Sequence, residues 1–310
     1  LFTLYLAAVL EVLGTNLSKS VYIRTRSDGK LFNRARLKSS TKTKEICVRD
    51  LLYADDSALV STDPDEIQEI VKHFAMASTM FGLTINVSKT ELLYQPPLLD
   101  QQPPCPDVLL NGRMLAQAES FVYLGSAVTS TNSSDLEVDR RIQAASKAFG
   151  SLYQRLWSRH DIKRTTKVKV YNAAVQPALL YSTECIILYR RHIKKLTRIQ
   201  LRHLRQILGI HWQERVPDVE VLRRAQTPSV EALIAASQLR WAGHVHRMPD
   251  SRLPKAVFYG ELSVGSRKHG GQKLRFKDVL KRHMKKANIN PDNWEQVASD
   301  RKKWRTSHDQ

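Results

Sequence analysis

The chain has 310 residues, room for two domains, and its 42% hydrophobic and 25% charged content excludes a wholly disordered protein. The formal net charge is +19: residues 1–150 hold 16 Lys and Arg against 17 Asp and Glu, and residues 151–310 hold 33 against 13. A half this basic indicates a polyanionic partner, most often nucleic acid, with a solvated basic surface or anionic lipid as alternatives.

The three cysteines and the apolar start of the chain indicate the compartment. Cys47, Cys105 and Cys185 form no C-x-x-C pair, so we expect neither a zinc site nor a disulfide framework. The apolar segment 1–13 predicts a buried helix, too short to cross a bilayer and without the basic flank of a signal peptide. We therefore expect a nuclear or cytoplasmic protein without a membrane partner. The missing initial methionine indicates a piece of something longer.

The first half predicts a mixed strand and helix region. Residues 17–46 are polar and basic and predict a loop or irregular ribbon, and residues 48–60 predict a β-hairpin with Asp55 and Asp56 at its bend. A helix follows, with Asp63 as N-cap and Gly82 as its stop. Further on, we expect a strand at 83–87, a break at the Pro-rich stretch 96–106, a hairpin turn at Asn111-Gly112 and a strand at 121–128.

From Asp135 onward the pattern becomes helical, so the predicted fold class is α+β. Pro177 is expected to kink the second long helix, and Gly209 to end the third. Residues 249–277 are rich in Gly, Lys and Arg and predict a loop. The predicted helices cover 135–158, 165–189, 190–208, 217–225, 227–246, 276–287 and 293–304.

The adjacent carboxylates Asp55 and Asp56 are the strongest chemical signal. In an apolar hairpin, their repulsion and desolvation are relieved by a divalent cation, and hard oxygen ligands suit Mg²⁺. A two-metal site of this kind stabilises the attacking and leaving oxygens in polymerases. An Asp-Asp pair alone is a weak signal and more often marks a solvated turn.

The surroundings of the pair make the chain resemble the reverse transcriptases of non-LTR, LINE-type retrotransposons. Tyr53-Ala54-Asp55-Asp56 resembles their Y-x-D-D box, and the other blocks follow in the family's order. These blocks are Leu1-Phe2 before the hairpin, Gly82-Leu83-Thr84-Ile85-Asn86-Val87-Ser88-Lys89-Thr90-Glu91, Phe121-Val122-Tyr123-Leu124-Gly125, Leu239-Arg240-Trp241-Ala242-Gly243-His244 and Gly270-Gly271-Gln272. The resemblance covers nearly the whole chain.

The resemblance implies roles for individual residues. Asp55 and Asp56 would bind Mg²⁺, with Mn²⁺ as an alternative, and Asp55 would be the more direct ligand. Lys89 would lie near the incoming triphosphate; otherwise it is a surface lysine. Tyr53 and the segment Tyr123, Leu124 and Gly125 would hold the primer; otherwise that segment is an ordinary core strand. The implied partners are an RNA template with a DNA primer or an RNA–DNA hybrid, and deoxynucleoside triphosphates only in the complete enzyme.

The resemblance also implies an incomplete polymerase. The family's other metal-binding aspartate and its nucleotide pocket lie on earlier palm strands, and residues 1–46 hold no matching block. An endonuclease domain and a C-terminal zinc knuckle, found in many relatives, are not in these residues either. We therefore expect a partial palm at 1–130, a helical thumb at 131–210 and a basic helical C-terminal region at 211–310, without polymerase activity of their own.

The basic half contains a candidate nucleic-acid surface. Lys194, Arg198, Arg202 and Arg205 recur every three or four residues, so they line one stripe of a helix; the alternative is a solvated face. Arg240 and Arg275 lie in basic segments further on, and Trp241 is either a stacking aromatic or a core anchor. The helices at 217–246 are also compatible with a helix-turn-helix.

Two other functions stay open. The chain is either the polymerase fragment described above or a remnant that now only binds RNA or DNA. A protein that binds a membrane surface through its basic face is a third hypothesis.

Overall fold

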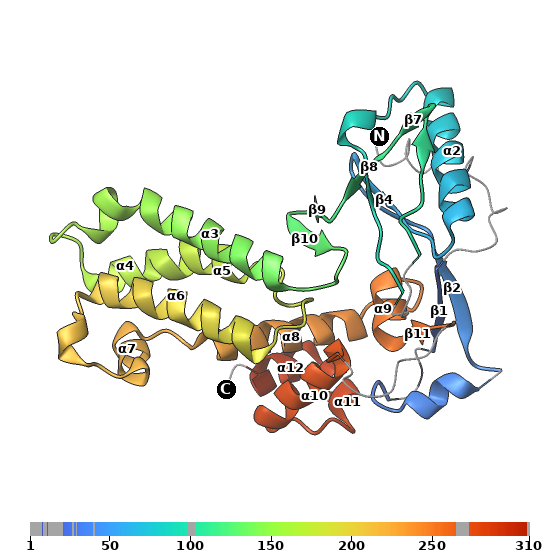
Figure 1. The fold of residues 1–310 in the computed structure, drawn as a ribbon. Coiled ribbons are helices and arrows are strands. Elements are labelled where there is room, and N and C mark those ends of the chain that lie inside the picture. Colours follow the sequence, from blue (N-terminus) through green and yellow to red (C-terminus); the bar gives the residue numbers. More distant parts are fainter. Residues whose placement is uncertain are drawn as a thin grey trace. The chain divides into compact units, whose positions relative to one another are not determined.

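The computed structural model describes residues 21–97, 103–264 and 273–308, apart from Ser27, Gly29 and Ser40, together with Ala8 and Glu11. The expected helix at 1–13 and the Gly270-Gly271-Gln272 block therefore lie largely or wholly outside the described residues. The described residues have an α+β fold (Figure 1). They form two compact units, one from residues up to Ser133 with 250–268, the other from 134–249 with 269–310.

The first unit contains a three-stranded antiparallel sheet where the sequence predicted a loop. Its strands are β1 (Val21–Thr25), β2 (Lys44–Val48) and β11 (Glu261–Leu262), in the order β11-β1-β2. Ile23 pairs with Ile46 on one side and Leu262 on the other. The prediction of a loop at 17–46 was wrong because β1 and β2 become strands only by pairing with each other across a long connection.

A buried arginine ties the end of this sheet to a short helix. Arg36 lies in the 3-10 helix Arg34–Lys38, and its Nη2 donates to the carbonyl of Tyr259 at 2.7 Å. Its Nη1 donates to the carbonyl of Arg26. Tyr259 ends α9 (Leu253–Tyr259), so the predicted loop at 249–277 is wrong for α9 and β11, while residues 265–272 lie outside the described part.

The predicted helix after the acidic hairpin is confirmed as α2 (Pro64–Met80). The carboxylate of Asp63 accepts the N–H groups of Asp65 and Glu66 at 3.0 and 3.2 Å, and Gly82 follows the helix with a φ of 71°. The helix buries Ile70, Val71 and Phe74. The strand expected at 83–87 is absent: the backbone there pairs with no strand and enters the 3-10 helix Val87–Lys89.

The remaining strands of the first unit form separate pairs. The turn predicted at Asn111-Gly112 is confirmed, with φ values of 52° and 75°. The single strand predicted at 121–128 is instead a hairpin that bends at Leu124 and Gly125. The pairs are β3 (Asp50–Tyr53) with β4 (Asp56–Leu59), β5 (Glu91–Leu93) with β8 (Ala116–Ala118) in parallel, β6 (Leu109–Leu110) with β7 (Arg113–Met114), and β9 (Ser120–Tyr123) with β10 (Ser126–Thr129).

The second unit is helical. The predicted end of the third long helix at Gly209 is confirmed by its φ of 68° at the C-cap. The helices are α3 (Asp135–Ser151), α4 (Arg164–Val170), α5 (Gln176–Leu180), α6 (Arg190–Leu208), α7 (Asp218–Ala225), α8 (Val230–His246), α10 (Phe276–Lys286), α11 (Trp294–Ser299) and α12 (Arg301–His308).

Two helical patterns read as continuous in the sequence are interrupted. A π-helical turn, Tyr153–Trp157, follows α3, and another, Tyr171–Val175, joins α4 to α5 just before Pro177. Proline removes an N–H donor and crowds the preceding turn, and a wider π turn accommodates both. The helix expected over 165–189 therefore ends at Leu180, and turns lead to α6.

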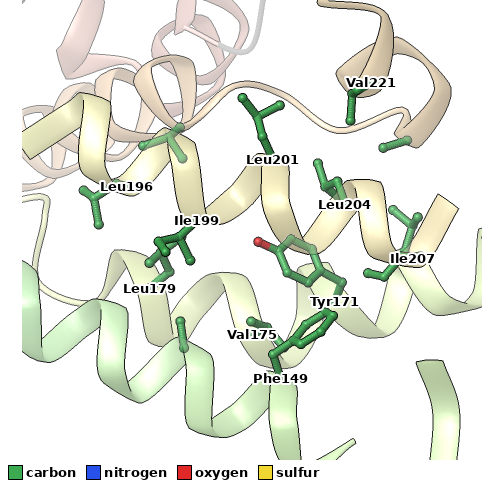
Figure 2. Packing of buried hydrophobic residues seen from close by; sticks show 14 of the residues in the cluster. Phe149, Tyr171, Val175, Leu179, Leu196, Ile199, Leu201, Leu204, Ile207 and Val221 are labelled. Carbon is green, nitrogen blue, oxygen red and sulfur yellow. The ribbon is translucent and has the colours of Figure 1, made fainter. Parts of the chain in front are cut away.

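The core of the second unit is built on aromatic side chains (Figure 2). Phe149 stacks on Trp157 and on His203, with ring centroids 4.9 and 4.1 Å apart. Figure 2 shows Phe149 and Tyr171 together with Leu204 in the buried space between the helices. His203 exposes only 5% of its surface, and burial followed by the charge of Arg202 lowers its pKa to about 4.

The C-terminal helices pack around two tryptophans. Trp294 and Trp304 are buried, with ring centroids 5.6 Å apart, and Trp304 Nε1 donates to the carbonyl of Leu239 at 3.0 Å. A Cβ on Gly243 would lie 2.2 Å from Trp304 Nε1, so α8 requires glycine at that position.

Candidate functional site

The acidic pair lies at the tip of the β3–β4 hairpin, as predicted. Tyr53 pairs with Asp56, which leaves Ala54 and Asp55 as the two turn residues. Ala54 has a φ of 51°, a left-handed conformation that costs a non-glycine residue roughly 1 kcal/mol. The apolar arms on either side make the strands, and their pairing sets this two-residue turn.

The two carboxylates are open to solvent. Asp55 and Asp56 are exposed, as is Tyr53 with 66% of its surface accessible. Within the described part of the chain, neither carboxylate has a recorded hydrogen bond or ion pair. The sequence predicted that both carboxylates would be desolvated in an apolar hairpin, but they are exposed to water. Their two negative charges still lie on adjacent residues.

The β9–β10 hairpin contacts the acidic hairpin through Tyr123. The Tyr123 hydroxyl donates to the carbonyl of Leu51, on β3, at 3.0 Å. Burial, and then the negative charge of Asp56, raises the pKa of Tyr123 above its ordinary value. The structure thus brings together two segments that are 72 residues apart at this contact. Leu124 and Gly125 form the adjoining turn, with φ values of 49° and 80°.

Lys89 is not brought to the acidic pair by any contact recorded among the described residues. It ends the 3-10 helix Val87–Lys89, and its side chain is exposed. The backbone turn around it is closed by its own N–H, which donates to the carbonyl of Asn86 at 3.1 Å. Its role beside a triphosphate stays a prediction.

The acidic pair provides oxygen ligands only. Two carboxylates suit Mg²⁺ or Mn²⁺, which complete their coordination with water or with substrate phosphate oxygens. Within the residues that the structure describes, no three His, Cys, Asp or Glu side chains gather into a group able to hold a metal ion. Any metal bound here would therefore have Asp55 and Asp56 as its ligands from the described residues.

Three of the four residues of the predicted cationic stripe are free. Lys194, Arg198 and Arg202 are exposed on α6, and no acidic partner is recorded for them within the described ranges. Arg205 is different because its Nη2 donates to Asp218 Oδ1 at 2.7 Å and to the carbonyl of Val216 at 3.1 Å. We refer to Lys194, Arg198 and Arg202 as the α6 stripe.

Another set of cations on α6 is neutralised. Arg190 pairs with Glu231 at 2.8 Å, Arg191 with Asp135 at 2.7 Å, and Lys195 with Asp139 at 2.9 Å. The same helix therefore carries one set of free cations and one set that bridges to neighbouring helices. Only the free set is available to phosphates without breaking an ion pair.

The other basic candidates have mixed surroundings. Arg240 is exposed on α8, whereas Arg275 is half-buried at the N-cap of α10. Trp241 is half-buried, with its ring 5.7 Å from that of His244. A side chain that the sequence arguments missed is Trp212, which is 83% exposed. The signal that could have found it is an aromatic residue in the short polar segment that follows the helix stop at Gly209.

No described helix combines the length and the apolar character that a bilayer crossing requires. The exposed side of α6 is instead charged, because it carries the free cations of the α6 stripe.

Comparisons with known proteins show distant similarity to mobile-element proteins. The chain is 25% identical over 265 residues to an uncharacterised transposon-derived protein of Caenorhabditis elegans, covering 82% of the chain and 93% of that protein. It is also 25% identical to the RNA-directed DNA polymerases of the mobile element jockey from Drosophila funebris and Drosophila melanogaster, over 74% and 78% of the chain. The chain spans 25% and 26% of those two polymerases. No family model and no solved structure matches it.

Proposed function

We propose that the chain is part of an RNA-directed DNA polymerase of a non-LTR, LINE-type retrotransposon. Residues 1–130 would be the rear of the palm, 131–210 the thumb and 211–310 the basic C-terminal region. The observation that carries the proposal is the Tyr123–Leu51 hydrogen bond, because it joins the hairpin of the acidic pair to the segment that resembles the primer grip. The distant similarity to the jockey polymerases supports the same function.

In this proposal Asp55 and Asp56 hold Mg²⁺, or Mn²⁺, with Asp55 the more direct ligand. When bound, the metal supplies positive charge to the attacking and leaving oxygens of nucleotide transfer. Tyr53 and Tyr123, with Leu124 and Gly125, position the primer end beside the pair. Lys89 offers a positive charge to the departing pyrophosphate.

The chain is proposed not to polymerise alone, because a polymerase metal site needs a further carboxylate, and the residues that the structure describes place none beside Asp55 and Asp56. A primer-extension assay on the purified chain, with an RNA template, a DNA primer and either Mg²⁺ or Mn²⁺, is expected to give no product. Extension that disappears in Asp55→Asn would show instead that the chain completes its own site.

Metal binding at the hairpin is testable without activity. Bound Mn²⁺ is paramagnetic, so we expect it to broaden the amide NMR signals of residues 53–57 and of Tyr123. The double variant Asp55→Asn with Asp56→Asn should abolish this broadening. The matched control is Glu69→Gln, an exposed acid on α2, which should leave it unchanged. Equal broadening in the double variant would reject the hairpin as a metal site.

Nucleic-acid binding is proposed to use the α6 stripe. Replacing Lys194, Arg198 and Arg202 by Gln should flatten the slope of log affinity against log salt by about two to three units on an RNA–DNA hybrid. The matched control replaces Arg190, Arg191 and Lys195, whose charges are already paired, and should change the slope less. Equal slopes for both triple variants would remove the stripe from the interface.

A second candidate is a remnant that binds RNA or DNA and has no catalytic role. The free cations of the α6 stripe favour it, because they need neither a metal nor Lys89. The two functions separate cleanly in the experiments above. Salt-dependent binding through the stripe together with no Mn²⁺ effect at the hairpin would favour the remnant over the polymerase part.

A further inference from the structure

The loop between α6 and α7 presents a tryptophan that the fold does not use. Trp212 is 83% exposed, whereas Trp157, Trp294 and Trp304 are buried and Trp241 is half-buried. The loop is anchored instead by Ile210 and Val216, which pack against the helical core. The indole is therefore not needed to close the loop.

The loop that carries Trp212 is fixed at both ends. At its start, the N–H groups of Gly209 and Ile210 donate to carbonyls in the last turn of α6. In its middle, the N–H of His211 donates to Glu214 Oε1 at 2.7 Å. At its end, Arg205 reaches from α6 to the carbonyl of Val216. Such a loop fixes the backbone at Trp212 before any ligand arrives, which reduces the backbone entropy lost on binding.

One arginine lies in this loop and another lies beside its start. Arg215 is exposed three residues after Trp212, and Arg202 lies on the preceding turns of α6. A Cβ on Gly209 would lie 3.6 Å from Arg164 Nη2, which places that guanidinium beside the start of the loop. Glu214, the acid within the loop, already accepts the N–H of His211. Two exposed arginines, Arg164 and Arg215, therefore accompany the loop of the exposed indole, against the single acid Glu214.

We propose that Trp212 is a stacking platform for an unpaired base of single-stranded nucleic acid. The proposal deepens the proposed function and rests on it only in taking nucleic acid as the partner. Each base has a flat π face, so an exposed indole binds it without reading sequence, while neighbouring cations hold the phosphates. Scattered exposed apolar residues are common, but this one combines a fixed loop with cations suited to a polyanion.

The α6 stripe lies on the helix that directly precedes this loop. Lys194 and Arg202 are eight residues apart, so the stripe extends over about 12 Å of helix. Gly209 then ends α6, and Trp212 follows within the same loop. A strand whose phosphates follow the stripe toward the C-terminal end of α6 would bring a base to the indole.

The test compares two ligands of equal charge: a short oligothymidylate and an abasic strand of the same length. Trp212→Ala should weaken binding of the oligothymidylate by roughly 5- to 150-fold, the range that the loss of one base–aromatic stack gives. Binding of the abasic strand should change little. Trp212→Phe should retain much of the affinity, because a phenyl ring still stacks, and it serves if Trp212→Ala folds poorly.

Fluorescence gives an independent measurement on the unsubstituted chain. A stacked base should quench the emission of the exposed Trp212, and acrylamide should then quench it less. The control Trp241→Phe should keep the effect, and Trp212→Phe should lose it.

Three outcomes would overturn the proposal. One is equal weakening for both strands, which would make Trp212 a structural residue; another is no weakening for either. The third is a dimer that sedimentation detects and that dissociates in the Trp212→Ala variant. This result would show that a second copy of the chain covers the indole. Each leaves the proposed function standing if Mn²⁺ still binds at Asp55 and the α6 stripe still sets the salt slope.

Discussion

The two units of the chain are stabilised in different ways. In its described residues, the strand-containing unit combines one three-stranded sheet and four strand pairs with the helices α2 and α9, and has small apolar clusters around Val71 and Phe74. The helical unit has one large core in which Phe149, Trp157 and His203 stack. Isolated strand pairs are marginal in water, so the first unit depends on contacts between hairpins, whereas the second depends on burial. The candidate metal ligands lie in the less buried unit.

The largest expected effect is in the helical core. Phe149→Ala should lower the free energy of unfolding by about 3–5 kcal/mol, because it leaves a cavity beside two stacked rings. All five tryptophans lie in the helical unit, so urea unfolding followed by their fluorescence reports on that unit. The control Phe74→Ala should leave the fluorescence midpoint unchanged and accelerate hydrogen exchange in α2. Equal midpoint shifts would mean that the units unfold together.

A smaller effect concerns pH. His203 has a pKa of about 4 in the folded chain, below the ordinary 6.5, so the unfolded chain binds this proton more readily. The resulting stability is present above about pH 6.5 and is lost as pH falls toward 4, at most about 3 kcal/mol. His283 has a lowered pKa and acts in the same direction.

The variant that tests this is His203→Phe. It keeps a flat ring against Phe149 and cannot titrate, so the loss of fluorescence-monitored stability between pH 6.5 and 4 should become shallower. An unchanged pH profile would assign the acid sensitivity of the helical unit to other groups.

A still smaller effect is expected between the two hairpins of the first unit. Tyr123→Phe removes the hydrogen bond to Leu51 and should cost about 0.5–1.5 kcal/mol. Hydrogen exchange should accelerate in β3, β4, β9 and β10, without a change in tryptophan fluorescence. Tyr53→Phe is the control, because that side chain is 66% exposed. Faster exchange in both variants alike would show that the hydroxyl of Tyr123 does not hold the hairpins together.

The smallest effect should come from the acidic pair. Asp55→Asn should change stability by less than about 0.5 kcal/mol, since the side chain is exposed and has no recorded partner within the described ranges. A gain in stability well above this value, measured by slower hydrogen exchange in β3 and β4 of the variant, would reveal strong repulsion between Asp55 and Asp56. Either result gives the free energy that the repulsion between Asp55 and Asp56 costs the β3–β4 hairpin.

Local signals predicted the fold where the structure is local. The cap at Asp63, the turn at Asn111-Gly112 and the stop at Gly209 each act within a few residues, and each is found as expected. The sheet of β1, β2 and β11 was missed because its pairing is long-range. The bend at Leu124 was missed because a bulky residue such as leucine rarely adopts a positive φ.

The candidate site follows the same division. The position of Asp55 and Asp56 at a hairpin bend could be predicted from the flanking apolar arms. The hydrogen bond from Tyr123 to Leu51 could not, because nothing in either segment specifies the other. Likewise, the ion pair between Arg205 and Asp218 joins separate elements, so the sequence did not show that Arg205 differs from the other three cations of the predicted stripe.

The return of residues 250–264 to the first unit affects how the chain folds during synthesis. β11 completes the sheet at the edge of β1, and the carbonyl of Tyr259 receives the buried guanidinium of Arg36. Both partners leave the ribosome only after residues 134–249 of the helical unit. The β1 edge of the sheet therefore stays unpaired during synthesis until residues 134–249 have left the ribosome. The strand-containing unit is thus an exception to the rule that N-terminal domains complete their folding first.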